Sequence, residues 1–172
     1  MPLHRVGGGL ALLAALLLIL LFGGGGSDPP SRGGSAPSGG PVNARVLRVI
    51  DGDTIEVGLG GRSEDVRYIG IDTPETVKPG TPVACFGPEA SERNHELVEG
   101  RTVQLEFDRE LRDAYGRLLA YVYADGRFVN AELVRGGYAR TLEFPPNTSR
   151  AAELGAIEAQ AGDAGRGMWG EC

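Results

Sequence analysis

The chain reads NARVLRVIDGDTIEVGLGGRSEDVRYIGI from residue 43 to residue 71. β-Branched and other apolar residues partly alternate with polar ones in 43–50, 54–59 and 65–71, and turn signals of the Asp-Gly and Gly-Gly type separate these segments. Because successive strands with short connections usually pair with each other, this part of the chain predicts three consecutive antiparallel strands.

The sequence after residue 71 predicts further helices and strands. Pro88 suits a first helical position and Gly100 a stop, which predicts a helix from about Pro88 to Glu99. The remaining elements are expected as strands at 102–107 and 118–123, a short helix that Asn130 caps and Gly136 ends, and a last helix from Thr148 or Ser149 to about Gly165. This order predicts an α+β fold, mainly β: a five-stranded OB-fold (oligonucleotide/oligosaccharide-binding) barrel with three packed α-helices.

The beginning of the chain differs in composition from the rest. Residues 10–22 form an unbroken apolar run of 13 residues behind a positive start, about 20 Å long as a helix against a hydrocarbon core of about 30 Å. The pattern predicts a secretory signal peptide in residues 1–26, or an uncleaved N-terminal anchor, because Gly and Ser follow the run where signal peptidase prefers Ala. Residues 27–41 are rich in Gly, Pro and Ser, which predicts a disordered linker before a folded domain at 42–172.

Export would carry the protein to an oxidising compartment. We expect it to be secreted and extracellular, or tethered to the membrane at the cell surface if residues 1–26 are retained. Such a compartment favours a disulfide between the two cysteines of the chain, Cys85 and Cys172. On the chain-entropy model the closed loop of 87 residues would stabilise the fold by about 4 to 5 kcal/mol. Two free thiols are the alternative.

The formal net charge of −6 limits how the protein can bind nucleic acid. Tight non-specific wrapping draws on many basic contacts and released counterions, which this balance argues against. Lys78 is the single lysine, so arginines must supply most contacts to phosphate. Several of the arginines are expected to be no more than solvated charges: Arg48, Arg109, Arg112, Arg140 and Arg150.

Acids and an arginine gather at the ends of the first strands. The motif Asp-Gly-Asp-Thr at 51–54 is followed by a second motif, Arg-Tyr-Ile-Gly-Ile-Asp-Thr-Pro-Glu, at 67–75. Carboxylate oxygens suit Ca²⁺ or Mg²⁺, and an arginine beside them offers a planar fork for a phosphate. The combination indicates phosphoester chemistry. Taken singly, each acid has an ordinary alternative as a turn, cap or loop residue, and each arginine as a surface charge.

The resemblance to a known family rests on a set of motifs. They are VIDGDT (49–54), IDTPET (71–76), FGPEAS (86–91), DAYGR (113–117), AYVYADG (120–126), VNAELVRGG (129–137) and EAQA (158–161). Through them the chain resembles the staphylococcal nuclease (thermonuclease) family over about residues 43–169. The resemblance implies an OB-fold barrel and a secreted, calcium-dependent endo- and exonuclease. Such an enzyme cleaves DNA and RNA at the bond to the 5′ oxygen and leaves 3′-phosphate ends.

The resemblance also implies a metal site. Asp53 and Asp72 would bind Ca²⁺ through their carboxylates, and Thr73 through its main-chain carbonyl. Two carboxylates and a carbonyl leave several positions of the ion for water and a phosphate oxygen.

Three further residues are implied as catalytic. Glu75 would be the general base that readies the attacking water, directly or through another water. Arg67 would hold the diester, and Arg117 would stabilise the five-coordinate transition state and the leaving oxygen.

The expected substrate-binding residues are Tyr115, Asp113 and Lys78. Tyr115 matches the position that lines the nucleotide pocket of the family, where an aromatic ring can stack on a base. Two departures bear on this pocket, since Ala114 stands where the family usually has lysine and only Phe144 where it has two tyrosines. They predict weaker binding of single-stranded ends or a different base preference.

The leading interpretation is thus a monomeric nuclease with DNA and RNA as substrates. A noncatalytic OB-fold module that binds nucleic acid is the main alternative, and loss of the acids or arginines would be its mark. A third hypothesis, an anchored interaction protein, predicts neither a calcium effect nor hydrolysis.

Overall fold

The computed structural model describes residues 40–76, 80 and 82–172. The predicted signal peptide or anchor, most of the predicted linker, and Lys78 lie outside the described residues. Within the described part of the chain, no helix combines the length and the apolar character that a membrane span requires.

Five long strands close into a barrel, as predicted. They are β1 (Val42–Asp51), β2 (Thr54–Leu59), β3 (Arg62–Tyr68), β5 (Thr102–Glu106) and β6 (Leu118–Ala124). Neighbours pair antiparallel in the order β3-β2-β1-β5-β6, and a parallel pairing of β3 with β6 completes the ring. A short strand, β7 (Arg127–Phe128), extends the β6 edge.

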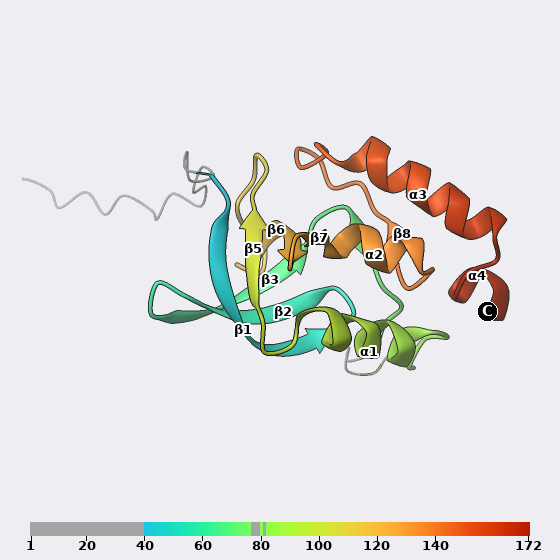
Figure 1. Ribbon diagram of the computed structural model, residues 1–172, viewed down its shortest axis with the longest axis horizontal. Coiled ribbons are helices and arrows are strands. Elements are labelled where there is room, and N and C mark those ends of the chain that lie inside the picture. The colour runs from blue at the N-terminus through green and yellow to red at the C-terminus, as the bar shows by residue number, and fades with distance from the viewer. Residues whose placement is uncertain (1–39, 77–79, 81) are drawn as a thin grey trace, which may run out of the picture. The chain divides into compact units, whose positions relative to one another are not determined.

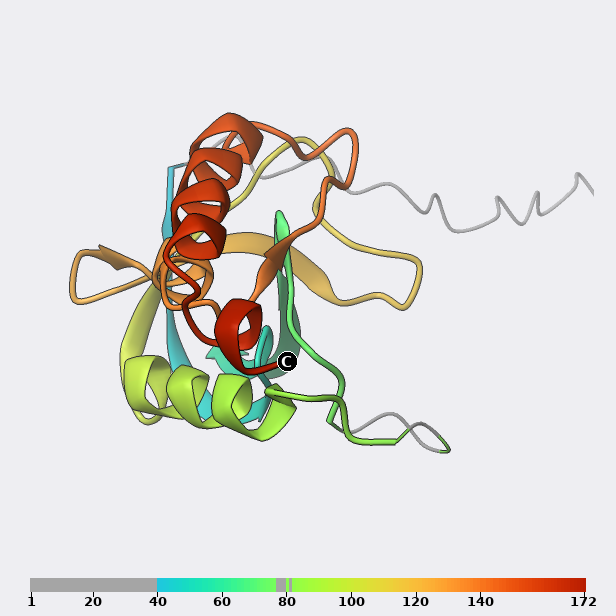
Figure 2. The ribbon, with the colours of Figure 1, turned by 90° about the vertical axis from the view of Figure 1, so that its right-hand side faces the viewer.

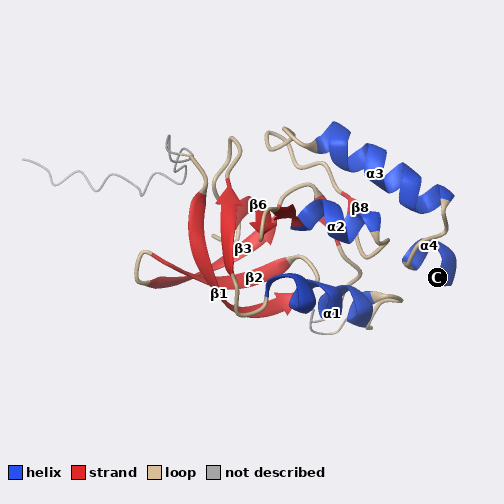
Figure 3. Cartoon of the chain, viewed as in Figure 1, coloured by secondary structure: helices blue, strands red, loops and turns tan. Residues whose placement is uncertain are grey.

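The helices cover the barrel from one side (Figures 1 and 3). α1 (Gly87–Val98) packs against β1, α2 (Val129–Arg135) packs against β6, and α3 (Ala151–Asp163) packs on α2. A single turn, α4 (Met168–Glu171), ends the chain. The core lies inside the barrel and beneath these helices, and its fully buried members include Ile55, Val57, Val66, Leu105, Val122, Leu133 and Leu154.

The third strand is interrupted near its expected end. β3 stops at Tyr68, Gly70 adopts a φ of 80°, and a separate strand, β4 (Ile71–Asp72), follows. A left-handed residue cannot continue a strand, and glycine accepts this conformation at little cost. β4 leaves the barrel and pairs with β8 (Arg140–Thr141), which places Asp72 opposite Arg140.

Asn130 does not cap α2, contrary to the prediction. The helix begins at Val129 with no side-chain cap, and Asn130 lies inside it, fully buried. Its amide oxygen accepts a hydrogen bond from the Val122 N–H at 3.0 Å, and its amide nitrogen donates to the Ile69 carbonyl at 2.8 Å. Asn130 therefore ties α2 to β6 and to the end of β3.

Cys85 and Cys172 form a disulfide bond, as predicted. The bond joins the segment before α1 to the last residue of the chain. Figure 2 shows α4 and the C-terminus beside the segment that leads from β4 to α1.

Candidate active site

A polar hollow of about 120 Å³ lies where the β1–β2 turn meets the segment after β4. All six residues expected to bind metal or catalyse line it: Asp53, Arg67, Asp72, Thr73, Glu75 and Arg117. The remaining lining residues are Asp51, Thr54, Pro74 and Thr76. Residues from 51 to 117 of the chain thus meet around one space.

The β1–β2 turn holds Asp53 in the wall of this hollow. Asp53 is buried, and its N–H donates to an Asp51 carboxylate oxygen at 3.0 Å. Its own Oδ2 accepts from the Thr73 N–H at 2.8 Å and from the Thr73 hydroxyl at 3.0 Å. A Cβ on Gly52 would lie 2.7 Å from that hydroxyl oxygen, so glycine is needed for the two segments to approach.

Arg67 links the two expected metal-binding acids. One guanidinium nitrogen, Nη2, lies 2.8 Å from Asp72 Oδ1 and 3.2 Å from Asp53 Oδ2. The other, Nη1, donates to the Tyr68 and Ile71 carbonyls at 3.0 and 2.9 Å. The side chain is only 14% exposed, so its position is set by these four oxygens.

The oxygens present suit a hard divalent cation. Asp53 and Asp72 both reach Arg67 Nη2, which means that one oxygen of each converges on the same region. Carboxylate and main-chain carbonyl oxygens are what Ca²⁺ prefers, so the donor set fits the ion that the resemblance implies. Among residues 40–76, 80 and 82–172, no group of three or more His, Cys, Asp or Glu side chains is arranged to hold a metal. The expected set has two carboxylates and relies on the Thr73 carbonyl and water for the rest.

The acids of the hollow carry excess negative charge. Burial, and then the charge of Asp53, raise the pKa of the Asp51 carboxyl from 3.8 to about 6. Partial burial and the charges of Asp53 and Glu75 raise the pKa of Asp72, against the lowering effect of Arg67. Solvent screens this second shift, since 59% of the Asp72 side chain is exposed. A bound cation would relieve the repulsion among these carboxylates.

Asp51 was not among the residues predicted for the site. Its carboxylate holds the N–H of Asp53 and its side chain borders the hollow. The Asp-Gly-Asp spacing is the signal that could have identified it, because a tight turn can bring acids two residues apart to the same side.

Arg117 enters the hollow from a loop that Asp113 organises. Asp113 Oδ1 accepts from the N–H groups of Tyr115 and Arg117, each at 3.0 Å. Its Oδ2 accepts from Arg117 Nε at 2.7 Å, which leaves the two terminal nitrogens of the guanidinium for another partner. The Asp113 side chain is only 8% exposed. Asp113, which was predicted to bind substrate, thus uses its carboxylate to hold Arg117.

Glu75 follows Pro74 in a loop that the start of α1 supports. Its Oε1 accepts a hydrogen bond from the Thr76 N–H at 2.9 Å. A Cβ on Gly87, the first residue of α1, would lie 3.1 Å from the Glu75 carbonyl oxygen and 2.7 Å from the Thr76 methyl. The close packing fixes the loop against the helix and keeps Glu75 at the rim of the hollow.

A second, more apolar hollow of about 200 Å³ adjoins the first. It shares Arg67 and Arg117 with the polar hollow, and its other walls include Tyr115 and Phe144. Tyr115 is 87% exposed, and the Arg117 guanidinium lies 5.5 Å from its ring centroid. An exposed aromatic ring in a hollow that also contains two arginines is suited to stacking a nucleobase. We refer to this space as the base hollow.

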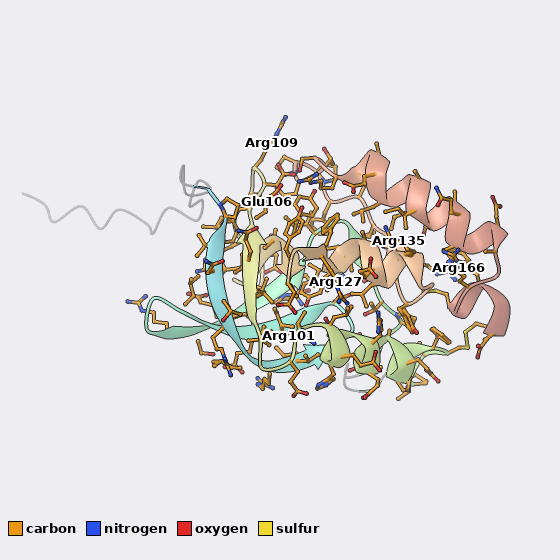
Figure 4. The ribbon with its side chains drawn as sticks, in the orientation of Figure 1. Arg101, Glu106, Arg109, Arg127, Arg135 and Arg166 are labelled. Atoms are coloured by element: carbon orange, nitrogen blue, oxygen red, sulfur yellow. A yellow bond between two sulfur atoms is a disulfide. The ribbon has the colours of Figure 1, made fainter. Side chains whose placement is uncertain are left out.

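The other arginines mostly lie on the outside, as expected for solvated charges. Arg48 pairs with Glu56 and Arg112 with Glu64. Figure 4 shows Arg109 extending away from the barrel. Arg140 differs, because it lies next to the site.

A family model described as staphylococcal nuclease homologue matches residues 65–171. The chain is 51% identical over 109 residues to endonuclease YncB of Bacillus subtilis, covering 62% of this chain and 52% of that protein. The SPbeta prophage-derived endonuclease YokF of the same organism is 45% identical over 130 residues, which are 74% of this chain and 44% of YokF. The thermonuclease of Staphylococcus hyicus is 41% identical over 125 residues, covering 73% of this chain and 74% of that protein. The chain therefore spans about half the length of the two Bacillus relatives.

Proposed function

The chain belongs to the staphylococcal nuclease family, and on that premise we propose that it is a calcium-dependent nuclease. It hydrolyses phosphodiester bonds of DNA and RNA as an endo- and exonuclease and leaves 3′-phosphate ends. The observation that carries the proposal is the meeting of two arginines, three aspartates and Glu75 around one hollow beside the base hollow. The names of the relatives, endonuclease and thermonuclease, support a nuclease activity.

Arg67 and Arg117 bind and orient the phosphate of the scissile bond. Both border the two hollows, so a diester held by them lies between the acids on one side and the exposed Tyr115 ring on the other. Arg67 moves at least part of its hydrogen bonding from Asp53 and Asp72 to the phosphate. Arg117, fixed through Nε by Asp113, presents its terminal nitrogens to the charge that develops in the transition state.

Glu75 accepts the proton of the attacking water. Its carboxylate lines the same hollow as both arginines, which is where we place the water that attacks phosphorus opposite the leaving 5′ oxygen. As the bond between phosphorus and the 5′ oxygen breaks, that oxygen takes up a proton from solvent water. Asp53, Asp72 and the Thr73 carbonyl would hold Ca²⁺, which when bound would supply positive charge to the phosphate and to the attacking water.

The substrate is a single-stranded or locally unpaired polynucleotide. A base in a stable duplex cannot leave its stack to meet Tyr115 without the cost of unpairing. Lys78, a further candidate for substrate binding, lies outside the described residues. We further propose that the protein acts as a monomer outside the cell, or at its surface if residues 1–26 remain attached.

A cleavage assay tests this proposal. Purified protein is incubated with a single-stranded DNA oligonucleotide in Ca²⁺, in Mg²⁺ or with a calcium chelator, alongside Glu75→Gln prepared in the same way. We expect cleavage in Ca²⁺ alone, products that a 3′-phosphatase can dephosphorylate, and little turnover by the variant. Binding without cleavage supports the noncatalytic module instead. Full activity in Mg²⁺ contradicts the calcium assignment, and equal activity of Glu75→Gln contradicts the role of that residue.

A further inference from the structure

A third hollow, of about 300 Å³, adjoins the polar hollow on a different side from the base hollow. It shares Asp72, Thr73 and Pro74 with the polar hollow but none of the residues that line the base hollow. Its other walls come from segments that the disulfide gathers together: Ala84, Cys85, Arg140, Met168 and Cys172. We call it the Arg140 hollow.

Among the residues that the structure describes, Arg140 is the single cationic side chain that lines this hollow. It is exposed, and its guanidinium lies 4.3 Å from the ring centroid of Trp169. Contact with the indole face reduces the number of conformations of the long side chain, while the guanidinium as a whole stays exposed. Within the described part of the chain, no carboxylate pairs with Arg140, whereas Arg48, Arg67, Arg112, Arg117 and Arg150 all have such partners.

The surroundings of Arg140 would tolerate an anion. Its partner across the β4–β8 pair is Asp72, whose carboxylate lies 2.8 Å from Arg67 and, in the proposed nuclease, would be neutralised as a ligand of Ca²⁺. The next residue in β8, Thr141, donates its N–H to a Glu158 carboxylate oxygen at 2.8 Å. These contacts fix the backbone that carries Arg140, a residue of the hollow's wall.

The three hollows follow one another. The base hollow and the polar hollow share Arg67 and Arg117, and the polar hollow and the Arg140 hollow share the segment from Asp72 to Pro74. In a polynucleotide, the nucleoside whose base enters the base hollow is joined through its 5′ phosphate to a second nucleoside, and the next phosphate lies on the far side of that second nucleoside. The order of the hollows matches that sequence of groups.

We propose that Arg140 binds the phosphate next to the cleaved one, on the strand side away from the base hollow. This inference rests on the proposed nuclease function and adds a subsite to it. A guanidinium suits this task because it offers parallel N–H groups to two phosphate oxygens. The subsite favours polynucleotides over substrates that carry only one phosphate diester, and each such contact contributes to the dependence of binding on salt.

The test compares Arg140→Ala, Arg140→Lys and wild type, with Arg62→Ala as a control of equal charge change. Arg62 is exposed at the far end of the β2–β3 hairpin, five residues along β3 from Arg67 and so about 17 Å away. Two substrates are used: a single-stranded DNA 12-mer, roughly the length that such grooves bind, and thymidine 3′-phosphate 5′-(nitrophenyl phosphate), which has no phosphate beyond the cleaved ester on that side. KM and kcat are measured across a series of salt concentrations.

For the oligonucleotide we expect Arg140→Ala to raise KM by about 5- to 20-fold, to leave kcat within about twofold, and to reduce the salt slope of log KM by about 1. Arg140→Lys should keep the salt slope, because the charge remains. The nitrophenyl substrate should show a change in KM of less than about twofold, and Arg62→Ala should match wild type on both substrates.

Two results would overturn the subsite. One is an Arg140→Ala variant that equals Arg62→Ala on the oligonucleotide, and the other is an equal loss on both substrates, which would mean a structural effect on the site. If wild type cleaves neither substrate, the proposed function fails. The same variants are then compared by the fluorescence anisotropy of a labelled 12-mer, where an unchanged Kd and salt slope for Arg140→Ala would overturn the subsite on its own.

Discussion

Asp113 and Arg117 show how one residue can place another. The carboxylate binds both the backbone of the 113–117 turn and the Nε of the arginine. A side chain that is held at Nε loses less conformational freedom when its terminal nitrogens bind phosphate. We regard Asp113 as a positioning residue, because its carboxylate is occupied by these internal contacts.

This role can be tested by substitution. Asp113→Asn retains an acceptor for the turn but removes the charge that holds Arg117, and we expect kcat to fall about 10-fold, against at least about 100-fold for Arg117→Ala. Because the two act as a pair, the double variant should be no slower than Arg117→Ala alone. Steady-state rates on one oligonucleotide provide the comparison, and a double variant whose loss equals the product of the single losses would refute the pairing.

Asp51 is predicted to destabilise the calcium-free protein at neutral pH. Folding raises the pKa of this carboxyl from 3.8 to about 6, so the folded state favours its protonated form. The contribution of the protonated carboxyl to stability is therefore fully present below pH 3.8 and is lost as the pH rises through about 6. Asp51→Asn removes this pH-dependent loss. We expect it to increase the free energy of unfolding at pH 7.5 by about 1 to 2 kcal/mol, less than the full free energy that corresponds to this change in pKa, because the group is partly solvated.

Urea unfolding in the presence of a calcium chelator measures this effect. The difference between Asp51→Asn and wild type should be larger at pH 7.5 than at pH 4. An equal difference at the two pH values would show that the carboxyl charge is not the cause.

At the scale of elements, α1 supports the turn that carries the acids. Asn94 is fully buried in this helix, donates to the Asp51 carbonyl at 2.9 Å and accepts from the Tyr68 hydroxyl at 2.9 Å. Tyr68 follows Arg67 on β3. The helix thereby joins the strand that positions Arg67 to the turn that positions Asp53.

Asn94→Ala should therefore weaken the fold. The substitution leaves a buried hydroxyl and a main-chain carbonyl without their partner, and we expect a loss of about 2 to 4 kcal/mol in the free energy of unfolding. Glu92→Ala, on the exposed side of the same helix, should change it by less than about 0.5 kcal/mol. Denaturant unfolding of both variants measures these changes in the free energy of unfolding. A small loss for Asn94→Ala would mean that water replaces the amide.

At the scale of the whole molecule, the disulfide joins the segment after the site to the end of the chain. Cys85 and Cys172 are separated by 87 residues, and both border the Arg140 hollow. Closing a loop of this length restricts the unfolded chain strongly. The bond also keeps α4, and with it Trp169, next to β8.

Removal of the disulfide should lower stability more than any surface substitution. We expect reduction, or the double change Cys85→Ser and Cys172→Ser, to lower the free energy of unfolding by about 2 to 5 kcal/mol. Urea unfolding with and without reductant measures the loss, and the double variant serves as the control because reductant should leave it unchanged. A wild-type midpoint that does not move with reductant would contradict the prediction.

The barrel strands and most helix ends could be predicted from the sequence, because they depend on local patterns. Alternating apolar residues marked β1 and β2, Pro88 and Gly100 marked the limits of α1, and the family motifs indicated which acids and arginines belong to the site. These signals lie within a few neighbouring residues. The chemical nature of the site could be inferred in the same way, since carboxylates and guanidinium groups carry their charge wherever the chain places them.

The contacts between distant segments could not be predicted in this way. The β4–β8 pair, the amide bridges of Asn94 and Asn130, and the place of Arg67 between two acids each join residues that no local pattern relates. Asn130 looked like a helix cap because capping is the usual local role of asparagine, but burial beside β6 gave its amide other partners. The sequence by itself determined which groups can do chemistry. Only the folded chain decided which of them meet, because their positions follow from the closure of the barrel and the packing of helices against it.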